Sequence, residues 1–235
     1  MKNIMIASTS TIYGSDYLEY LLEDLAVFFE KASTILFIPY ARPGGISHNN
    51  YTEVVKKAFS KINKSVVGIH EYSNPSEAVT KAQAIFTGGG NTFVLTNQLY
   101  KNNLIEALQT TIKNGTPYLG TSAGSNICGL TIKTTNDMPI VYPPSFNALG
   151  LVPFNINPHY LDPVSGSTHM GETRETRIKE FHHYNTQPVV GLREGSWLHV
   201  NDNSIILKGT LNARIFEYNK SPYEIEPGTE LNHLK

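Results

Sequence analysis

The stretch Pro117-Tyr118-Leu119-Gly120-Thr121-Ser122-Ala123-Gly124-Ser125-Asn126 decides the fold of this 235-residue chain. It begins with a short apolar run typical of a buried strand and continues with small residues that suit the start of a helix. Between the two lies G-x-S-x-G, in which glycines permit a sharp turn that raises the Ser122 hydroxyl at the carboxyl end of a sheet. The motif predicts a nucleophilic serine in an α/β fold. The alternative is a small-residue turn that only packs a helix on a strand.

Short β-branched runs alternate with helix-periodic stretches on the amino-terminal side of this motif. The apolar residues of these runs are consecutive, as in strands that are covered on both faces. The predicted strands are Asn3–Ala7, Thr34–Pro39, Ser65–His70, Ala84–Thr87 and Thr116–Gly120. Helical spacing is found between them, over residues 15–29, 50–60, 75–82 and 104–113. The alternation predicts an α/β fold on a mostly parallel sheet with right-handed crossovers.

The carboxyl-terminal half is less regular. Prolines crowd residues 139–163, which predicts a long ordered loop region with short strands. A helix is expected over Glu172–Tyr184, and strands follow at residues 189–192, 196–200, 204–207 and 214–218. Asn201-Asp202-Asn203 is a hairpin-type turn between the middle two. No repeat or linker divides the sequence, so we expect one domain over residues 1–235.

Composition narrows the classes of protein. Hydrophobic residues make up 40% and charged residues 17%, with a net charge of -1 and no basic block, which argues against a nucleic-acid or membrane-surface partner. Apolar runs are far shorter than the roughly 20 residues of a membrane-spanning helix. The single cysteine, Cys128, excludes an internal disulfide and a thiolate metal cluster, and its spacing from Ser122 predicts a buried packing residue. We expect a cytoplasmic monomer or homodimer without metal or cofactor.

A second glycine-rich segment, Thr87-Gly88-Gly89-Gly90-Asn91-Thr92, also follows a predicted strand. Its exposed N–H groups suit either a phosphate or a developing oxyanion. The sequence has neither G-x-x-x-x-G-K-[ST] nor G-x-G-x-x-G, so the usual nucleotide fingerprints are missing. Neighbouring strand ends in an α/β sheet meet at one crevice, so an acyl-transfer site accounts for both glycine motifs. The N–H of Ala123, directly after Ser122, is expected to face the same oxyanion.

A nucleophilic serine needs a base, and His159 is the preferred choice among eight histidines. It ends a short apolar run and is braced by a proline, whereas His169, in a Gly/Ser/Thr loop, is a candidate substrate contact. The carboxylate that orients the imidazole stays open. Asp137, Glu194 and Asp162 all fit that role, and spacing does not choose among them.

Six segments together resemble the peptidase E family of serine peptidases, which contains α-aspartyl dipeptidases and cyanophycinase. They are IFTGGGNTF (85–93), YLGTSAGSN (118–126), TIKTTNDMPIV (131–141), FNINPHY (154–160), GETRETRIKE (171–180) and GLREGSWLHV (191–200). Their order and spacing extend the resemblance over nearly the whole chain. It implies a three-layer αβα sandwich with a mostly parallel sheet, similar to class I glutamine amidotransferases and flavodoxin-like in architecture.

The resemblance also implies roles for individual residues. Ser122 matches the nucleophile and His159 the base. Asp137 falls at the family's charge-relay aspartate, and Glu194 matches a glutamate also proposed as the third member, so both are kept. Gly90, with Ala123, falls where oxyanion N–H groups are expected.

One departure from the family is Thr121, which stands where tryptophan is expected in close relatives and is expected near the mouth of the site. The expected activity is hydrolysis of dipeptides with an N-terminal aspartate (Asp-X) through an acyl-enzyme. Arg174 is the candidate for the substrate carboxylate, because guanidinium binds carboxylate bidentately. The alternative for Arg174 is a solvated arginine on a helix face. The alternatives for the protein as a whole are a cyanophycinase-like peptidase acting on β-linked aspartyl-arginine chains and a non-catalytic amidotransferase-like binding module.

Overall fold

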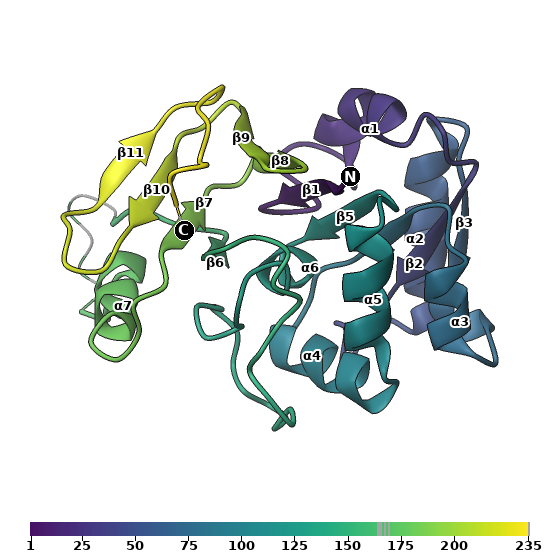
Figure 1. Ribbon diagram of the computed structural model, residues 1–235, viewed down its shortest axis with the longest axis horizontal. Helices are drawn as coiled ribbons and strands as arrows, with labels where there is room; N and C mark the ends of the chain where they lie inside the picture. The colour runs from purple at the N-terminus through teal and green to yellow at the C-terminus, as the bar shows by residue number, and fades with distance from the viewer. Residues whose placement is uncertain (164–165, 167, 169, 235) are drawn as a thin grey trace.

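A seven-stranded sheet forms the centre of the computed structural model, which is drawn in Figure 1 and describes residues 1–163, 166, 168 and 170–234. The strand order is β3-β2-β4-β5-β1-β8-β9, in which the first five strands run parallel and β8 and β9 form an antiparallel hairpin. The strands are β1 (Asn3–Ala7), β2 (Thr34–Ile38), β3 (Ser65–Gly68), β4 (Ile85–Thr87), β5 (Tyr118–Thr121), β8 (Ser196–Asn201) and β9 (Ser204–Gly209). The predicted α/β fold with a mostly parallel sheet is confirmed.

Helices cover both faces of this sheet. Successive residues of a strand point to opposite faces, and β1 shows the result: Ile4 and Ile6 belong to one buried cluster and Met5 to another. The first cluster contains side chains of α3 (Pro75–Thr80), α4 (Thr92–Lys101) and α5 (Leu104–Lys113). The second contains side chains of η1 (Glu19–Leu21), α1 (Leu22–Phe28) and α2 (His48–Ser60). The two clusters lie on opposite faces of the sheet and join it to a layer of helices on each side, which gives the three layers of an αβα sandwich.

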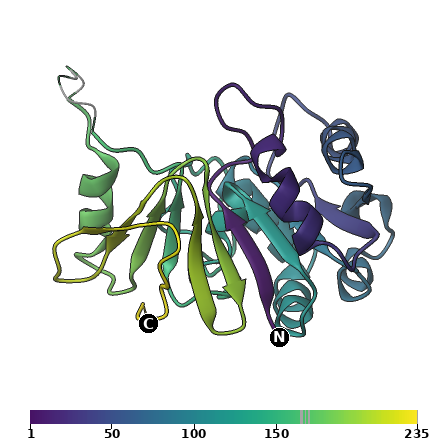
Figure 2. The same cartoon turned by 90° about the horizontal axis from the view of Figure 1, so that it is seen from above.

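A second sheet, which the sequence did not predict as a separate unit, lies beside the first (Figure 2). Its order is β11-β10-β7-β6, formed by β6 (Asn155–Pro158), β7 (Val189–Leu192), β10 (Ala213–Phe216) and β11 (Tyr223–Ile225). β6 and β7 are parallel, and the other neighbours are antiparallel. α7 (Arg174–Phe181) packs Ile178 against Val189 and Phe216 of this sheet.

The first predicted helix, over residues 15–29, is shorter than expected. The chain takes a left-handed conformation at Leu18 (φ 59°), whose N–H donates to Ser10 O at 2.7 Å, so a 3-10 turn precedes the α-helix that begins at Leu22. Helical spacing alone cannot detect such a long-range backbone contact. In the described part of the chain, the helices are too short or too polar to span a membrane.

The topology brings three segments of the site together. β4 and β5 are parallel neighbours with Thr87 opposite Gly120, so the glycine-rich segment and the serine turn leave the sheet side by side. The short helix α6 (Ala123–Asn126) then lies against β6, where Asn126 Nδ2 donates to Ile156 O at 2.7 Å. This contact places the end of β6, and with it His159, next to the serine turn.

Candidate active site

Ser122 sits on a strained turn between β5 and α6. Its backbone has φ 54° and ψ −111°, a region that non-glycine residues rarely occupy and that costs about 1–3 kcal/mol. The close approach of the surrounding backbone requires the flanking glycines: a Cβ at Gly124 would lie 2.2 Å from Thr87 O, and one at Gly120 2.3 Å from Gly124 O. G-x-S-x-G therefore builds the sharp turn that the sequence predicted. Thr121, expected near the mouth of the site, is instead completely buried under this turn.

His159 lies within hydrogen-bond distance of the nucleophile candidate. Its Nε2 is 2.9 Å from Ser122 Oγ. The backbone at His159 is also left-handed (φ 54°), and its N–H donates to Ser8 Oγ at 2.9 Å. Ser8 in turn donates to Leu192 O at 2.7 Å, so one buried hydroxyl connects β1, β7 and the histidine. The imidazole is held from two directions while 36% of its side-chain surface stays accessible.

Glu194 occupies the other side of the imidazole. Its Oε1 lies 2.6 Å from His159 Nδ1, although 48% of the glutamate side chain is exposed. With the proton on Nδ1 donated to this carboxylate, Nε2 is free to accept the Ser122 hydroxyl proton. The three groups form one continuous line of hydrogen bonds from carboxylate to serine.

Asp137 is not in contact with His159. Its Oδ2 accepts a hydrogen bond from the backbone N–H of Thr92, the first residue of α4, at 2.7 Å, and another from Thr135 Oγ1 at 3.1 Å. A carboxylate at a helix amino terminus is stabilised by the exposed N–H groups there. The structure thus puts Glu194, and not Asp137, beside the histidine. Asp162, the third candidate carboxylate, forms an ion pair with Arg193 and not with His159.

The two backbone N–H groups expected to face an oxyanion flank Ser122. The N–H groups of Gly90 and Ala123 have no hydrogen-bond partner within the described part of the chain. Gly90 has φ 145°, and a Cβ there would lie 2.2 Å from Ala41 O, so only glycine fits. A Cβ placed on neighbouring Gly89 would lie 2.8 Å from Ser122 Cβ, which shows how closely this loop approaches the serine.

Arg174 begins α7 and lies in a positively charged environment. Desolvation, and then the charge of Arg177, lower the pKa of Arg174, while the negative charge of Asp137 opposes that shift. Both arginines line a small cavity of about 50 Å³ together with Lys133 and the buried Asn157. Arg174 has no ion-pair partner among the described residues, so its guanidinium is a candidate anion-binding group.

A clamp of charged residues, which the sequence motifs do not predict, lies behind the histidine and glutamate. Arg193, next to Glu194 in the chain, makes two hydrogen bonds to Asp162 (2.9 and 2.8 Å) and two to Glu224 (2.8 and 2.9 Å). Its guanidinium also lies 5.4 Å from the ring centroid of Tyr160, the residue after His159. The clamp fixes the two chain segments that carry the imidazole and its carboxylate.

The other histidines in the described part of the chain lie outside this arrangement. His169 lies outside the described residues. Several of the remaining ones contact side chains or backbone elsewhere, namely His70 with Asn49, His182 with Gln187 O, His199 with Asn3 and His233 with Tyr223.

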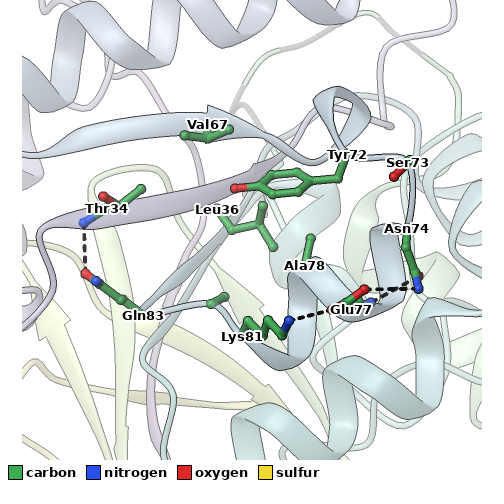
Figure 3. A pocket seen from close by; sticks show the side chains of 11 residues that line it. Thr34, Leu36, Val67, Tyr72, Ser73, Asn74, Glu77, Ala78, Lys81 and Gln83 are labelled. Atoms are coloured by element: carbon green, nitrogen blue, oxygen red, sulfur yellow. Dashed lines mark hydrogen bonds and ion pairs between the residues drawn. The ribbon is translucent and has the colours of Figure 1, made fainter.

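A larger hollow of about 390 Å³ lies at the β3 edge of the first sheet, between α3 and strands β2 and β3 (Figure 3). Leu36 and Val67 form part of its floor, and Glu77 and Lys81 form an ion pair at its rim. No histidine in the described part of the chain lines this hollow, so it lacks a serine–histidine pair like the one at Ser122. The acid–base chemistry therefore lies at the serine turn, and not in this hollow or in one of about 660 Å³ lined by Lys2, Leu130 and Asp202.

A serine on a strand–turn–helix corner defines a serine hydrolase when a histidine and a carboxylate follow it in one line of hydrogen bonds and two nearby N–H groups have no partner among the described residues. A family model for "Peptidase family S51" matches residues 4–208. A Streptomyces coelicolor protein named "Peptidase E" is 46% identical over 99% of this chain and 94% of its own length. A Drosophila melanogaster protein named "Probable alpha-aspartyl dipeptidase" is 44% identical over 99% and 97%. The chain belongs to peptidase family S51, the family of serine peptidases that the sequence motifs predicted.

A solved structure agrees with the fold. The crystal structure of a peptidase from an acI-B1 Actinobacterium superimposes with a TM-score of 0.72 at 14% identity and covers 98% of this chain and 96% of that chain.

Proposed function

We propose that this serine peptidase is a dipeptidase that hydrolyses Asp-X dipeptides with an N-terminal aspartate. The observation that carries the proposal is the line of hydrogen bonds from Glu194 through His159 to Ser122. Arg174, which lies close enough to Asp137 for their charges to interact, is the candidate for the substrate carboxylate. Family membership and the names of the relatives support the substrate class.

The reaction follows from the contacts around Ser122. His159 Nε2 accepts the hydroxyl proton as Oγ attacks the scissile carbonyl, and Glu194 stabilises the imidazolium that forms. The N–H groups of Gly90 and Ala123 bind the tetrahedral oxyanion, a contribution of about 3–4 kcal/mol per donor. His159 then protonates the leaving amine. Water, activated by the same imidazole, attacks the aspartyl ester of Ser122 and releases aspartate.

Substrate aspartate carries two charges that a dipeptidase must recognise. Arg174 is proposed to bind its β-carboxylate, because a guanidinium offers two parallel donors to a carboxylate. Asp137 is proposed to bind the free α-ammonium group. Its Oδ2 is taken by Thr92 and Thr135, whereas its Oδ1 has no hydrogen-bond partner among the described residues. An ammonium site beside the scissile bond would restrict cleavage to the first residue of a short peptide.

The test is hydrolysis of Asp-Leu and Leu-Leu by the wild type, Ser122→Ala and Arg174→Met. The proposal expects cleavage of Asp-Leu only, no cleavage by Ser122→Ala, and a raised KM for Asp-Leu in Arg174→Met. Equal turnover of the two dipeptides would overturn the substrate assignment. Release of Asp-Arg from a β-linked aspartyl-arginine polymer would favour the cyanophycinase-like alternative. If a fluorophosphonate fails to label Ser122, the non-catalytic alternative is favoured.

A cytoplasmic location and a monomeric or homodimeric state are parts of the same proposal. Cys128, the single cysteine, is buried and donates to Gly124 O at 3.3 Å, and burial raises the pKa of its thiol. A packed, un-ionised thiol has the role predicted for it and suits a reducing compartment.

A further inference from the structure

The carbonyl oxygen of Gly89 accepts hydrogen bonds from two side chains that the reaction does not otherwise use. Arg42 Nε donates from 3.1 Å and the Tyr51 hydroxyl from 3.3 Å. The guanidinium carbon of Arg42 lies 5.2 Å from the centroid of the Tyr51 ring, so the two donors also contact each other. Tyr51 is buried and packs edge-on against Phe37 of β2. The carbonyl is therefore held by two donors, and one of them, the Tyr51 hydroxyl, is on a buried ring.

This carbonyl belongs to the same peptide unit as the N–H of Gly90. A trans peptide unit is planar, and its C=O and N–H point in opposite directions. Donors that fix the Gly89 carbonyl on one side consequently aim the Gly90 N–H to the other side. Gly89 itself packs against Ser122, and the Gly90 N–H has no partner within the described chain. The next N–H, that of Asn91, is held by Ala41 O at 2.7 Å.

We propose that Arg42 and Tyr51 are positioning residues that hold and polarise the Gly89–Gly90 peptide so that its N–H stabilises the oxyanion. The inference rests on the proposed function. Glycines on both sides of this peptide put little steric restriction on its rotation. A rotated peptide would turn the Gly89 carbonyl toward the oxyanion, where it repels negative charge. A charge-assisted hydrogen bond to the carbonyl prevents the rotation and also strengthens the N–H as a donor.

A second role for Arg42 has to be distinguished from this one. Arg42 is exposed, and its guanidinium beside the Gly89–Gly90 peptide could instead bind the α-carboxylate of the leaving residue X. Such a contact would be lost with a substrate that has no carboxylate there and would act mainly on KM. Positioning of the oxyanion peptide acts on the transition state for every substrate and therefore on kcat.

The experiment compares Arg42→Met, Arg42→Lys and Tyr51→Phe with the wild type on Asp-Leu and on aspartyl p-nitroanilide. We expect Arg42→Met and Tyr51→Phe to lose about tenfold in kcat on both substrates, with KM within about twofold. Arg42→Lys keeps a charged donor and should recover part of the loss. Tyr100→Phe is the matched control, because its hydroxyl donates to Asn147 O at 3.1 Å and takes no part in the proposed site.

Unchanged kcat in Arg42→Met and Tyr51→Phe overturns the inference, and so does a loss confined to KM for Asp-Leu. The rate at which a small fluorophosphonate labels Ser122 gives a readout that does not depend on aspartyl substrates. If the wild type is labelled but cleaves neither substrate, the proposed function fails, and the labelling rates still test Arg42 and Tyr51. Slower labelling of both variants supports the inference, and equal labelling contradicts it.

Discussion

His159 and Glu194 follow two neighbouring parallel strands, β6 and β7, and join through Nδ1 and Oε1 at 2.6 Å. Pro158 of β6 lies opposite Leu192 of β7, so the sheet itself sets the separation of the two side chains. A half-exposed glutamate is otherwise free to move, and each exposed ion pair is worth only about 0–1 kcal/mol. The strand pairing therefore supplies the orientation that burial supplies in other serine hydrolases.

Glu194→Gln tests this orientation. The amide cannot stabilise the imidazolium, and it can favour the wrong tautomer of His159, so we predict a loss of about a thousandfold in kcat. Steady-state kinetics on Asp-Leu measure the loss. A change of less than about threefold would show that Glu194 is not the orienting carboxylate.

Asp137→Asn should behave differently, because Asp137 contacts Thr92 and Thr135 and not the histidine. We predict that KM for Asp-Leu rises about tenfold or more while kcat falls much less, as expected when substrate binding loses a charge partner. A loss in kcat larger than that of Glu194→Gln, with KM unchanged, would show that Asp137 is the carboxylate that orients His159.

Arg193→Met should destabilise the protein in a pH-dependent way. The Arg193 hydrogen bonds lower the pKa of Asp162, so this carboxylate contributes stability above its unfolded pKa of about 3.9 and loses it as the pH falls through the lower folded value. Urea unfolding should show a difference between wild type and variant that is present near neutral pH and shrinks in acid. A difference that grows in acid would contradict the clamp.

Ser122→Gly should stabilise the protein while abolishing activity. Glycine relieves the strain at φ 54° and ψ −111°, and a gain of about 1 kcal/mol corresponds to about 2–4 °C in Tm for a chain of this size. Ser122→Ala is the matched control, because it removes the hydroxyl but keeps Cβ. Equal melting temperatures for the two variants would show that the turn stores no strain.

The whole chain is predicted to unfold as one domain. One buried cluster contains Ile6 and Leu198 of the first sheet together with Val190 and Ile215 of the second. Calorimetry should therefore give a van't Hoff enthalpy equal to the calorimetric one. Two separate transitions would divide the chain into two domains.

The sequence was most informative where local signals agree with the final structure. β1 was predicted at its observed bounds, and the serine turn was found because its glycines are required by contacts within one strand–turn–helix unit. The place of His159 at a strand end, after a proline, is likewise a local signal. The choice between Asp137 and Glu194 was out of reach, because it depends on β6 pairing with β7 across a long connection. The second sheet and the Arg193 clamp were missed for the same reason.

The most direct test of the central claim compares Asp-Leu with Asn-Leu as substrates of the wild-type protein. The two dipeptides have nearly the same shape and differ in the charge that Arg174 is proposed to bind. We predict that kcat/KM for Asp-Leu is larger by at least about a hundredfold. The neutral amide of Asn-Leu leaves the charge of the Arg174 guanidinium without a carboxylate partner. Equal values for the two dipeptides would contradict an aspartyl dipeptidase.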